Sequence, residues 1–290
     1  MLRRLHSRSR PFSASLLATT AANLGFPGTC RKFAADANTP GDPYHDKYFD
    51  FGSPKYWDDF YHRKLRSEAD GAAAVQGATQ GAGWFEWFET ADSALPAIEA
   101  VASKVARNRS LPDVAGGLDI LHVGSGTSSL GFRLAEAGHN VCNVDVCEEA
   151  LAFLESQAAA SHSDGNSSKP TGTNSFVHLD VLDIAKHFGP ESFDLVVDKG
   201  TLDALLFRGL DPARDMCRAI CTVLREGGAY AQLTREDPEL RMEAFAIDDL
   251  PWSVSWHAVS SSDSGLATSE LFDETPFLFV CSKNHDHAHK

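Results

Sequence analysis

Two glycines and several acidic residues in the sequence could together hold a nucleoside-containing ligand. An apolar segment, 118–123, leads to Gly124 and Gly126, and Asp145 ends the next apolar segment about 20 residues later. Glycines let a backbone approach a ligand closely, and a carboxylate at this spacing meets ribose hydroxyls in nucleotide-binding βαβ units. A further apolar segment ends in Asp198. The pattern predicts a cofactor across the carboxyl ends of a parallel sheet. An ordinary strand–helix turn, with Asp145 as a helix N-cap, is the alternative.

The glycine turn lacks the third glycine of dinucleotide-binding folds. That glycine lets the following helix pack closely while its N-terminus faces a pyrophosphate, and here the position holds Ser129. A cofactor without a pyrophosphate makes no such demand. S-adenosylmethionine fits the pattern, because its methionine part would pass Gly124 and Gly126 while its ribose diol reached Asp145. A reductase would also need a Tyr-x-x-x-Lys pair, and no tyrosine of the sequence has a lysine four positions later.

Strands and helices are predicted to alternate around these residues. We expect strands at 118–123, 140–145, 176–179, 193–197 and 229–234, with helices at 128–137, 148–159, 212–225 and 238–246. The pair Gly227-Gly228 is predicted to stop the helix 212–225. Two later apolar segments, 252–259 and 276–281, have no helix between them and are predicted to pair antiparallel. The predicted fold is therefore α/β: a doubly wound, mostly parallel, seven-stranded Rossmann-like sheet with an antiparallel last strand and an N-terminal helical extension.

Three stretches of the sequence resemble one enzyme family. They are Leu-His-Val-Gly-Ser-Gly-Thr-Ser-Ser-Leu at 121–130, Val-Val-Asp-Lys-Gly-Thr-Leu-Asp-Ala at 196–204, and Thr-Arg-Glu-Asp-Pro-Glu-Leu-Arg at 234–241. With Asp145 at its strand end, they resemble the class I, seven-β-strand protein-lysine methyltransferases over about residues 84–282. The resemblance implies a Rossmann-like fold, S-adenosylmethionine as the cofactor, and transfer of its methyl group to a lysine Nε on a protein.

The resemblance also implies roles for individual residues. The cofactor-binding residues would be Gly124, Ser125, Gly126, Asp145, Asp180, Val181 and Trp57. The catalytic residue would be Asp198, where acceptor and methyl group meet, and the substrate-binding residues would be Asp203, Glu236 and Asp237. No metal site is implied, and the six cysteines include no Cys-x-x-Cys pair that would indicate zinc or a redox motif.

Some of these residues have a structural alternative. Asp198 could cap the following helix, and Asp237 could do the same with a proline in the first turn. Trp57, Trp84 and Trp87 are predicted to form a lid over the cofactor, because adenine and a sulfonium both favour aromatic faces; core packing is the alternative.

The motifs also contain His122, Ser125 and Lys199, whose roles the resemblance does not settle. His122 stands where the family usually has an acidic residue that helps to hold the methionine end, and Ser125 stands where it has cysteine. A protonated imidazole would repel the ammonium, so we expect either a pH dependence near the ordinary pKa of histidine or a tolerated exchange with a bridging water. Lys199 could counter the charge of Asp203.

The N-terminal residues 1–36 are predicted to be a mitochondrial transit peptide. Residues 1–35 hold six lysines and arginines, no acidic residue, and many Ser, Ala, Leu and Thr. The whole chain carries 26 basic and 40 acidic residues. A negative field repels phosphate backbones, so we expect no nucleic-acid partner. No apolar segment approaches the ~20 residues of a membrane-spanning helix, so no membrane partner is expected.

The remaining chain is predicted to divide into a helical lid segment at 42–115, a methyltransferase domain at 116–283 and a tail at 284–290. In the lid segment, Ser53-Pro54 begins one predicted helix, 93–107 is another, and 67–83 is a linker. The transit peptide and the stretch 234–241 favour the branch that methylates citrate synthase in the mitochondrial matrix. The segment 51–57 resembles the start of elongation factor 1-alpha lysine methyltransferases, which is one alternative. A small-molecule methyltransferase and a non-catalytic S-adenosylmethionine-binding assembly protein are others.

Overall fold

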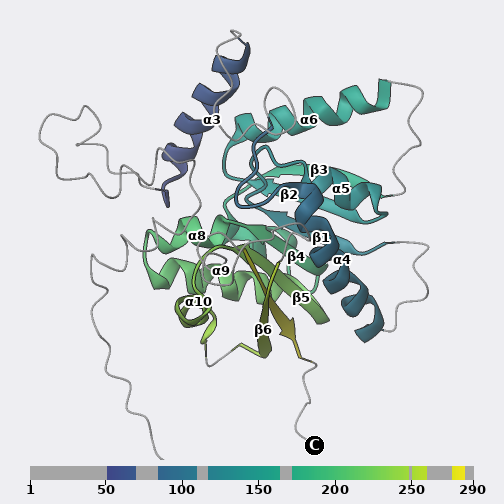
Figure 1. The fold of residues 1–290 in the computed structure, drawn as a ribbon, viewed down its shortest axis with the longest axis vertical. Helices are drawn as coiled ribbons and strands as arrows, with labels where there is room; N and C mark the ends of the chain where they lie inside the picture. Colours follow the sequence, from purple (N-terminus) through teal and green to yellow (C-terminus); the bar gives the residue numbers. More distant parts are fainter. Residues whose placement is uncertain are drawn as a thin grey trace, which may run out of the picture.

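A seven-stranded sheet forms the centre of the computed structural model, which describes residues 51–69, 84–109, 117–163, 172–247, 250–259 and 276–284. The strand order is β3-β2-β1-β4-β5-β7-β6 (Figure 1). The strands are β1 (Asp119–Val123), β2 (Asn140–Asp145), β3 (Thr173–His178), β4 (Phe193–Lys199), β5 (Leu224–Thr234), β6 (Trp252–Ala258) and β7 (Phe277–Lys283). Neighbours from β3 to β5 are parallel, and β7 is antiparallel to both β5 and β6. The predicted fold class is confirmed.

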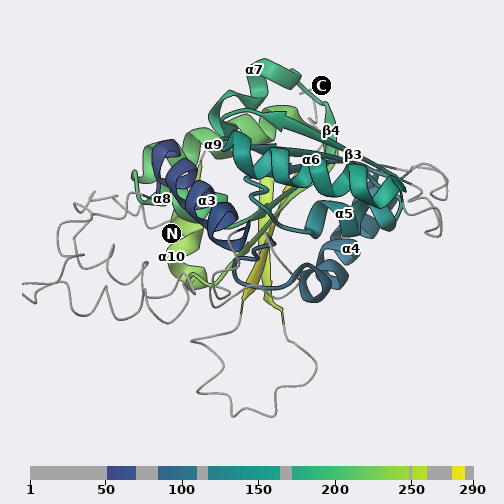
Figure 2. The same cartoon turned by 90° about the horizontal axis from the view of Figure 1, so that it is seen from above.

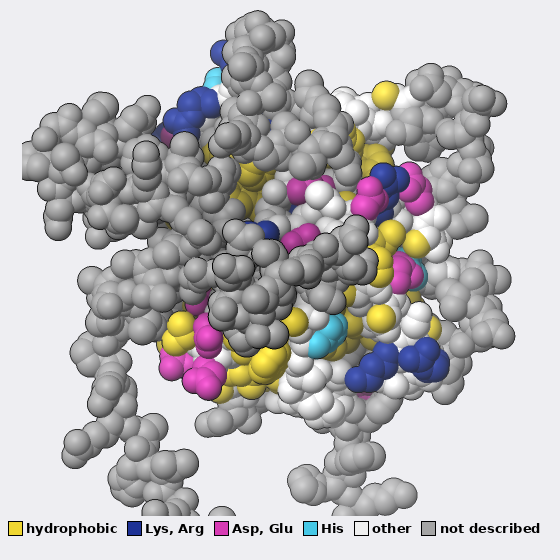
Figure 3. All heavy atoms as spheres, viewed as in Figure 1, with side chains coloured by type: hydrophobic (Ala, Val, Ile, Leu, Met, Phe, Trp, Pro, Cys, Tyr) yellow, Lys and Arg dark blue, Asp and Glu magenta, His cyan; other side chains and the backbone are white. Residues whose placement is uncertain are grey.

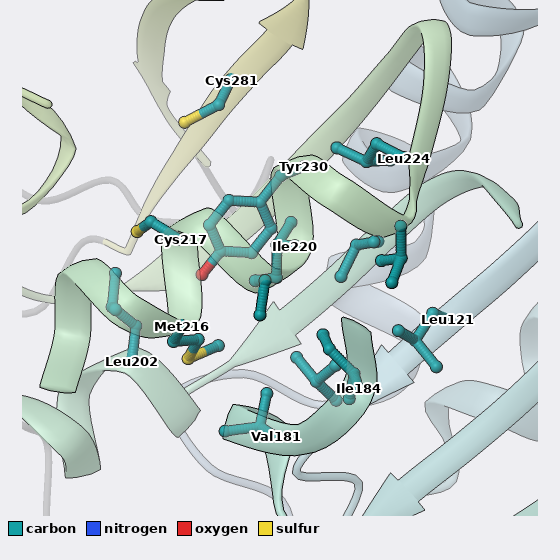
Figure 4. Close-up of a cluster of buried hydrophobic side chains, with 14 of the residues drawn as sticks. Leu121, Val181, Ile184, Leu202, Met216, Cys217, Ile220, Leu224, Tyr230 and Cys281 are labelled. Atoms are coloured by element: carbon teal, nitrogen blue, oxygen red, sulfur yellow. The ribbon is translucent and has the colours of Figure 1, made fainter. Parts of the chain in front are cut away.

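Helices cover both faces of the sheet (Figures 1 and 2). They are α3 (Pro54–Ala69), α4 (Ala91–Asn108), α5 (Leu130–Glu136), α6 (Glu148–Ser163), α7 (Ile184–Phe188), α8 (Thr201–Leu206), α9 (Leu210–Val223) and α10 (Pro238–Phe245), with a 3-10 turn η1 at Val181–Asp183. Alternate residues of a strand point to opposite faces. Ile120 of β1 therefore packs in a cluster with α4, and its neighbour Leu121 packs in a second cluster with α9. Figure 4 shows the second cluster, in which the Tyr230 ring lies beside Ile220 and Cys217.

The N-terminal extension rests on the carboxyl side of the sheet. α3 begins at Pro54, as the sequence predicted, because proline is well suited to the first turn of a helix. Tyr61 of α3 is buried against Cys147 and Ala150 at the start of α6. This contact places α3 beside the ends of the strands that carry the predicted site.

Some element boundaries differ from the prediction. α9 ends at Val223, and Gly227-Gly228 lie inside β5 rather than at a helix end. The pairing of β4 with β5 shifts register here, and a Cβ at Gly228 would lie 2.7 Å from the Asp194 carbonyl oxygen, so the glycine admits a close approach of two backbones. Three short elements, η1, α7 and α8, were not predicted, since each spans six residues or fewer.

Several predicted segments lie outside the described residues. These are the transit peptide at 1–36, most of the linker at 67–83, and all but the first residue of the tail at 284–290. Within the part of the chain that the structure describes, no helix combines the length and the hydropathy that crossing a bilayer requires.

Candidate active site

A hydrogen bond joins the glycine turn to Asp145. The carboxyl ends of β1 and β2 lie together because the two strands are parallel neighbours. The Gly126 N–H donates to Asp145 Oδ2 at 2.7 Å, and the Cys147 N–H donates to Oδ1 at 2.8 Å. Gly126 has a φ of +50°, and a Cβ there would meet the Tyr61 hydroxyl, so only glycine suits the turn. Burial raises the pKa of Asp145, and the backbone hydrogen bonds oppose that shift.

One cavity lies across the carboxyl ends of the parallel strands. Gly124 lines it from the turn after β1, Asp145 from the end of β2, and Asp180 and Val181 from the turn after β3. Much of the remaining lining is aromatic: Phe51, Trp57, Tyr61, Trp87, Phe88 and Phe207. Five predicted cofactor-binding residues thus share the cavity, whereas Ser125 and Gly126 support it without lining it.

Acceptor atoms in this cavity suit a nucleoside. Asp180 Oδ1 accepts the Leu182 N–H at 2.9 Å and so caps η1, and no described residue donates to the other oxygen. The donors to Asp145 are backbone N–H groups, and a carboxylate has about four acceptor sites in all. A vicinal diol can therefore still bind Asp145, and an exocyclic amine can bind Asp180. The residues present fit S-adenosylmethionine.

Two of the three predicted lid tryptophans line the cavity. The rings of Trp57 and Trp87 meet edge to face, with centroids 5.6 Å apart. Trp84 instead packs against the rings of Phe132 and Phe153, at centroid distances of 5.5 and 5.2 Å, away from the cavity lining. Trp57 and Trp87 therefore line the cavity, whereas Trp84 packs as in the core-packing alternative.

Asp198 forms the N-terminal cap of α8. Its side chain is fully buried, and its oxygens accept the Thr201 N–H at 2.7 Å, the Leu202 N–H at 3.1 Å and the Tyr230 hydroxyl at 2.7 Å. Burial, and then the charge of Asp203, raises the pKa of Asp198 to about 6. Asp198 does not line the cavity. The geometry favours the capping alternative over contact with the reacting atoms.

Asp203 lines the cavity, but both of its oxygens are already engaged. Oδ1 accepts Arg241 Nη2 at 2.6 Å and the Thr234 hydroxyl, and Oδ2 accepts Gln232 Nε2 at 2.8 Å. Arg241 is fully buried, so this is an ion pair sealed from solvent. The pair considered between Lys199 and Asp203 is not formed. Arg241 lies inside the 234–241 stretch but was not predicted as a site residue, because no feature of its spacing marks it as a partner of Asp203.

Lys199 is paired with Glu86, a residue that the sequence analysis did not select. Their side chains are each 3% exposed, and Lys199 Nζ lies 2.7 Å from Glu86 Oε2. Glu86 also accepts the Ser128 hydroxyl at 2.6 Å and the Ser129 N–H at 2.8 Å, at the start of α5. Burial opposes the ionisation of Glu86, but Lys199 and the hydrogen bonds together lower its pKa. Glu86 thus ties the segment 84–89 to the start of α5 and to the end of β4. The available signal in the sequence was an acidic residue between four aromatic ones.

The other two predicted substrate-binding residues lie outside the cavity lining. Asp237 is exposed and caps α10, with Oδ1 accepting the Glu239 N–H at 2.8 Å and Pro238 in the first turn. Glu236 is buried, and its N–H donates to the Thr234 hydroxyl at 3.0 Å. Of the three residues, only Asp203 contributes to the cavity.

His122 is neutral inside the sheet. It is 1% exposed, and its Nδ1 lies 3.0 Å from Asn143 Oδ1. Asn143 Nδ2 donates to Asn174 Oδ1 and to the Ser175 carbonyl, which turns Oδ1 toward the ring and makes Nδ1 the protonated nitrogen. Burial lowers the pKa of His122 to about 4. A pH dependence near the ordinary pKa of histidine is therefore wrong for this residue, since the imidazole is uncharged there.

Metal-binding side chains do not gather in the described part of the chain. Among those residues, no three or more histidines, cysteines and acidic residues are placed to hold an ion. The five described cysteines are all buried as free thiols.

Comparisons with known proteins agree with this geometry. Residues 121–231 match a protein family described as a methyltransferase domain. The chain is 32% identical over 170 residues to the mitochondrial citrate synthase-lysine N-methyltransferase of Danio rerio, covering 54% of this chain and 61% of the relative. It is 26% identical over 241 residues to EEF1A lysine methyltransferase 4 of Mus musculus, covering 78% and 79%.

The chain thus spans about three fifths of the length of the citrate synthase-lysine methyltransferases that it matches. Among solved structures, the cyclase SpnF has the same fold, with a TM-score of 0.50, 14% identity, and coverage of 80% of this chain and 96% of that one. The methyltransferase domain match, the seven-stranded topology and the similarity to these relatives lead to one assignment. Residues 121–231 match a methyltransferase domain, in a chain that resembles the citrate synthase-lysine methyltransferases.

Proposed function

We propose that the protein is a protein-lysine N-methyltransferase of the mitochondrial matrix that acts on citrate synthase. The observation that carries the proposal is the line of Gly124, Asp145 and Asp180 at the ends of β1, β2 and β3, in a cavity that continues into an aromatic wall. The name of the Danio rerio relative supports the substrate and the compartment, and the basic, acid-free residues 1–35 support the compartment as well.

S-adenosylmethionine supplies an electrophilic methyl group when it is bound. In the proposal, the backbone of Gly124 passes the methionine part, Asp145 accepts the ribose hydroxyls, and Asp180 accepts the adenine amino group. Val181 and Trp57 pack against the cofactor. Methyl transfer is an in-line displacement, so the protein must above all align acceptor and donor. Trp87 and the other aromatic side chains exclude water, which favours the neutral amine that can attack.

The acidic residues beyond the cavity would act on the substrate at a distance. Acidic side chains gather over α10 on the face shown in Figure 3, where Asp237, Glu239 and Glu243 are exposed. Such a surface attracts a basic region of a partner protein and speeds its encounter. We assign Asp237 to this acidic surface. We assign the buried residues Asp203 and Glu236 to structural support of the neighbouring cavity wall. Asp198 is proposed to position α8, which carries Thr201 and Ala204 of the lining.

A lysine of elongation factor 1-alpha is the second candidate substrate. The favouring observation is the extent of the match, because the Mus musculus relative aligns over 78% of this chain, against 54% for the Danio rerio relative. One experiment separates the two. Purified protein is incubated with tritiated S-adenosylmethionine and either citrate synthase or elongation factor 1-alpha, and the labelled band is identified. Label in citrate synthase alone supports the proposal, and label in elongation factor 1-alpha alone replaces it with the second candidate. Failure to label either would contradict both.

The substitution Asp145→Ala tests the proposed binding of the S-adenosylmethionine ribose by Asp145. Loss of two charge-assisted hydrogen bonds to the ribose should weaken the binding of S-adenosylmethionine by roughly 10- to 100-fold, as measured by isothermal titration calorimetry. Asp183→Ala is the matched control, because that carboxylate is half exposed and bonds only to Lys186 on the surface of the described structure. Equal affinities of Asp145→Ala and the wild type would remove Asp145 from the site.

A further inference from the structure

Phe88 has a backbone conformation that a bulky residue rarely adopts. Its φ is +63°, and Glu191, at +53°, is the only other non-glycine with a positive φ in the described part of the chain. This region of φ brings a side chain close to its own backbone and is therefore unfavourable for a bulky residue. Such conformations persist only where the surroundings impose them, and they gather at functional sites.

Two basic side chains, Arg235 and Lys199, donate hydrogen bonds to the backbone at Trp87 and Phe88. Arg235 Nη2 donates to the Phe88 carbonyl at 2.7 Å, and Lys199 Nζ donates to the Trp87 carbonyl at 3.0 Å. Lys199 ends β4 and Arg235 follows β5, so both come from the carboxyl ends of neighbouring strands. Arg235 is further oriented by Glu89, at 3.7 Å. The chain thus fixes two successive carbonyls, and with them the direction of the Phe88 ring.

The Phe88 ring lies close to the turn that follows β4. It lines the cavity, and a Cβ at Gly200 would lie 3.2 Å from Phe88 Cε2. Gly200 follows β4, whereas Gly124, Asp145 and Asp180 follow β1, β2 and β3. In the strand order β3-β2-β1-β4-β5, β4 is next to β1, so along the carboxyl edge Phe88 lies nearer to Gly124 than to Asp145 and Asp180. This leaves the β4 side of the cavity for a second reactant.

We propose that Phe88 is a specificity-determining residue for the acceptor: its ring forms the wall against which the methylene stem and ammonium of an alkylamine are held, and Arg235 is the positioning residue that keeps it there. This inference rests on the proposed amine methylation. An aromatic face attracts an ammonium by a cation–π interaction and its area covers the apolar stem. The strained backbone serves to present the ring where a relaxed conformation would turn it away.

The central experiment compares wild type with Phe88→Ala. The KM for citrate synthase should rise about tenfold, because the cation–π contact and apolar cover are lost, while the Kd for S-adenosylmethionine from calorimetry stays within about twofold. A second readout needs no turnover: binding of n-butylammonium, which has the stem and charge of a lysine side chain, is followed by ligand-observed NMR with S-adenosylhomocysteine present. Phe88→Ala should weaken this binding by a similar factor.

Glycine substitutions distinguish the effect of losing the Phe88 ring from the effect of relieving its backbone strain. Phe88→Gly also removes the ring but relieves the backbone, so it should lose acceptor affinity as Phe88→Ala does and yet melt at a higher temperature than Phe88→Ala. Glu191→Gly is the matched control. Glu191 also has a positive φ, and its carbonyl also accepts from an arginine, Arg225 Nε at 3.0 Å, but it is exposed and remote from the cavity lining. It should gain stability without any change in acceptor KM.

Arg235 variants test the positioning claim. Arg235→Met removes the donor to the Phe88 carbonyl and should raise the acceptor KM nearly as much as Phe88→Ala, with kcat less affected. Arg235→Lys can still donate one hydrogen bond and should restore much of the wild-type KM. A normal KM for folded Arg235→Met would overturn the positioning role.

The outcomes distinguish this inference from the proposed function. If Phe88→Ala weakens S-adenosylmethionine and leaves the acceptor KM and butylammonium binding intact, the ring belongs to the cofactor and the inference is overturned. If wild type binds S-adenosylmethionine but transfers no methyl group to citrate synthase, the proposed substrate fails. Butylammonium binding to wild type and Phe88→Ala then decides the inference on its own, since equal binding overturns it.

Discussion

At the scale of single residues, His122 stands where related enzymes usually have an acidic residue. The replacement removes a negative charge from this position without adding a positive one. The imidazole is buried, bonded to Asn143, and has its pKa lowered to about 4. It is thus a neutral donor within β1, one residue before the strand meets the glycine turn. The methionine end of a cofactor therefore meets no added positive charge from this position.

Burial of His122 should make stability depend on pH. Between its folded pKa of about 4 and the ordinary 6.5, the unfolded chain binds a proton that the folded chain does not. The free energy of unfolding should therefore fall as pH drops from 6.5 toward 4, by up to about 3 kcal/mol. Asp198, with its raised pKa, contributes the opposite slope below pH 6, so the measurement is a difference between variants.

The comparison uses urea unfolding of wild type and His122→Gln at pH 4.5 and 7.5. The glutamine can still donate to Asn143 but does not titrate, so the pH dependence of its stability should be shallower. His187→Gln is the control, because His187 is exposed on α7. Parallel curves for wild type and His122→Gln would show that the imidazole titrates normally.

The sequence predicted some residue positions well because local backbone rules decide them. Gly126 and Asp145 meet because a strand–turn–helix unit leaves little freedom between the ends of adjacent parallel strands. The partners of Lys199 and Asp203 could not be predicted, because both are long-range: Glu86 is 113 residues from Lys199, and Arg241 is 38 residues from Asp203. Spacing in one sequence carries no information on such pairs.

At the scale of elements, the junction between β4 and α8 concentrates much of the chemistry. Asp198 accepts the first two N–H groups of α8, and the helix then presents Thr201 and Ala204 to the cavity. Gly200, with a φ of +105°, allows the sharp turn between strand and helix. Each residue of the motif Asp-Lys-Gly-Thr therefore has a structural role. The aspartate caps α8, the lysine pairs with Glu86, the glycine allows the turn, and the threonine lines the cavity.

Asp198→Ala should act first on stability. It leaves two N–H groups of α8 uncapped and the buried Tyr230 hydroxyl unpaired, which should cost roughly 2–4 kcal/mol. Thermal denaturation measures the loss, and Asp237→Ala, which removes an exposed cap, should cost about 1 kcal/mol or less. Adding Tyr230→Phe to Asp198→Ala should recover part of the loss. An Asp198→Ala variant with wild-type stability but no methyl transfer would instead restore a catalytic role.

Most strands and long helices were predictable, whereas short helices were not. β2 runs over the predicted residues because its apolar run is bounded by polar residues at both ends. α9 was extended past Val223 because Gly227-Gly228 resemble a helix stop, and only the tight passage beside Asp194 in β4 explains their presence in β5. A close approach between two strands cannot be inferred from either strand alone.

At the scale of the whole molecule, charge should govern the encounter with a protein substrate. The chain carries 40 acidic and 26 basic residues, and α10 together with its N-cap Asp237 displays three exposed acidic side chains. Raising the salt from about 50 to about 300 mM should increase the KM for a basic protein acceptor while leaving the Kd for S-adenosylmethionine nearly unchanged. Steady-state kinetics and calorimetry supply the two constants.

Two triple variants with the same change in net charge test whether the salt dependence of KM comes from the acidic residues over α10. Neutralising Asp237, Glu239 and Glu243 should flatten the salt dependence of KM. Neutralising three exposed glutamates elsewhere, Glu136, Glu155 and Glu191, should leave most of it. An equal response of the two triple variants would assign the attraction to net charge rather than to the surface over α10.

The position of β7 has a consequence for how the sheet is completed. β7 follows every other strand along the chain, yet it lies between β5 and β6. While the polypeptide is still being made, β5 therefore exposes a row of unpaired amides and carbonyls, and β6 has no neighbour to dock on. An unpaired strand edge invites pairing with other chains. Assembly of this protein thus waits on its latest-made strand, and a chaperone that shields β5 until then would protect the nascent chain from aggregation.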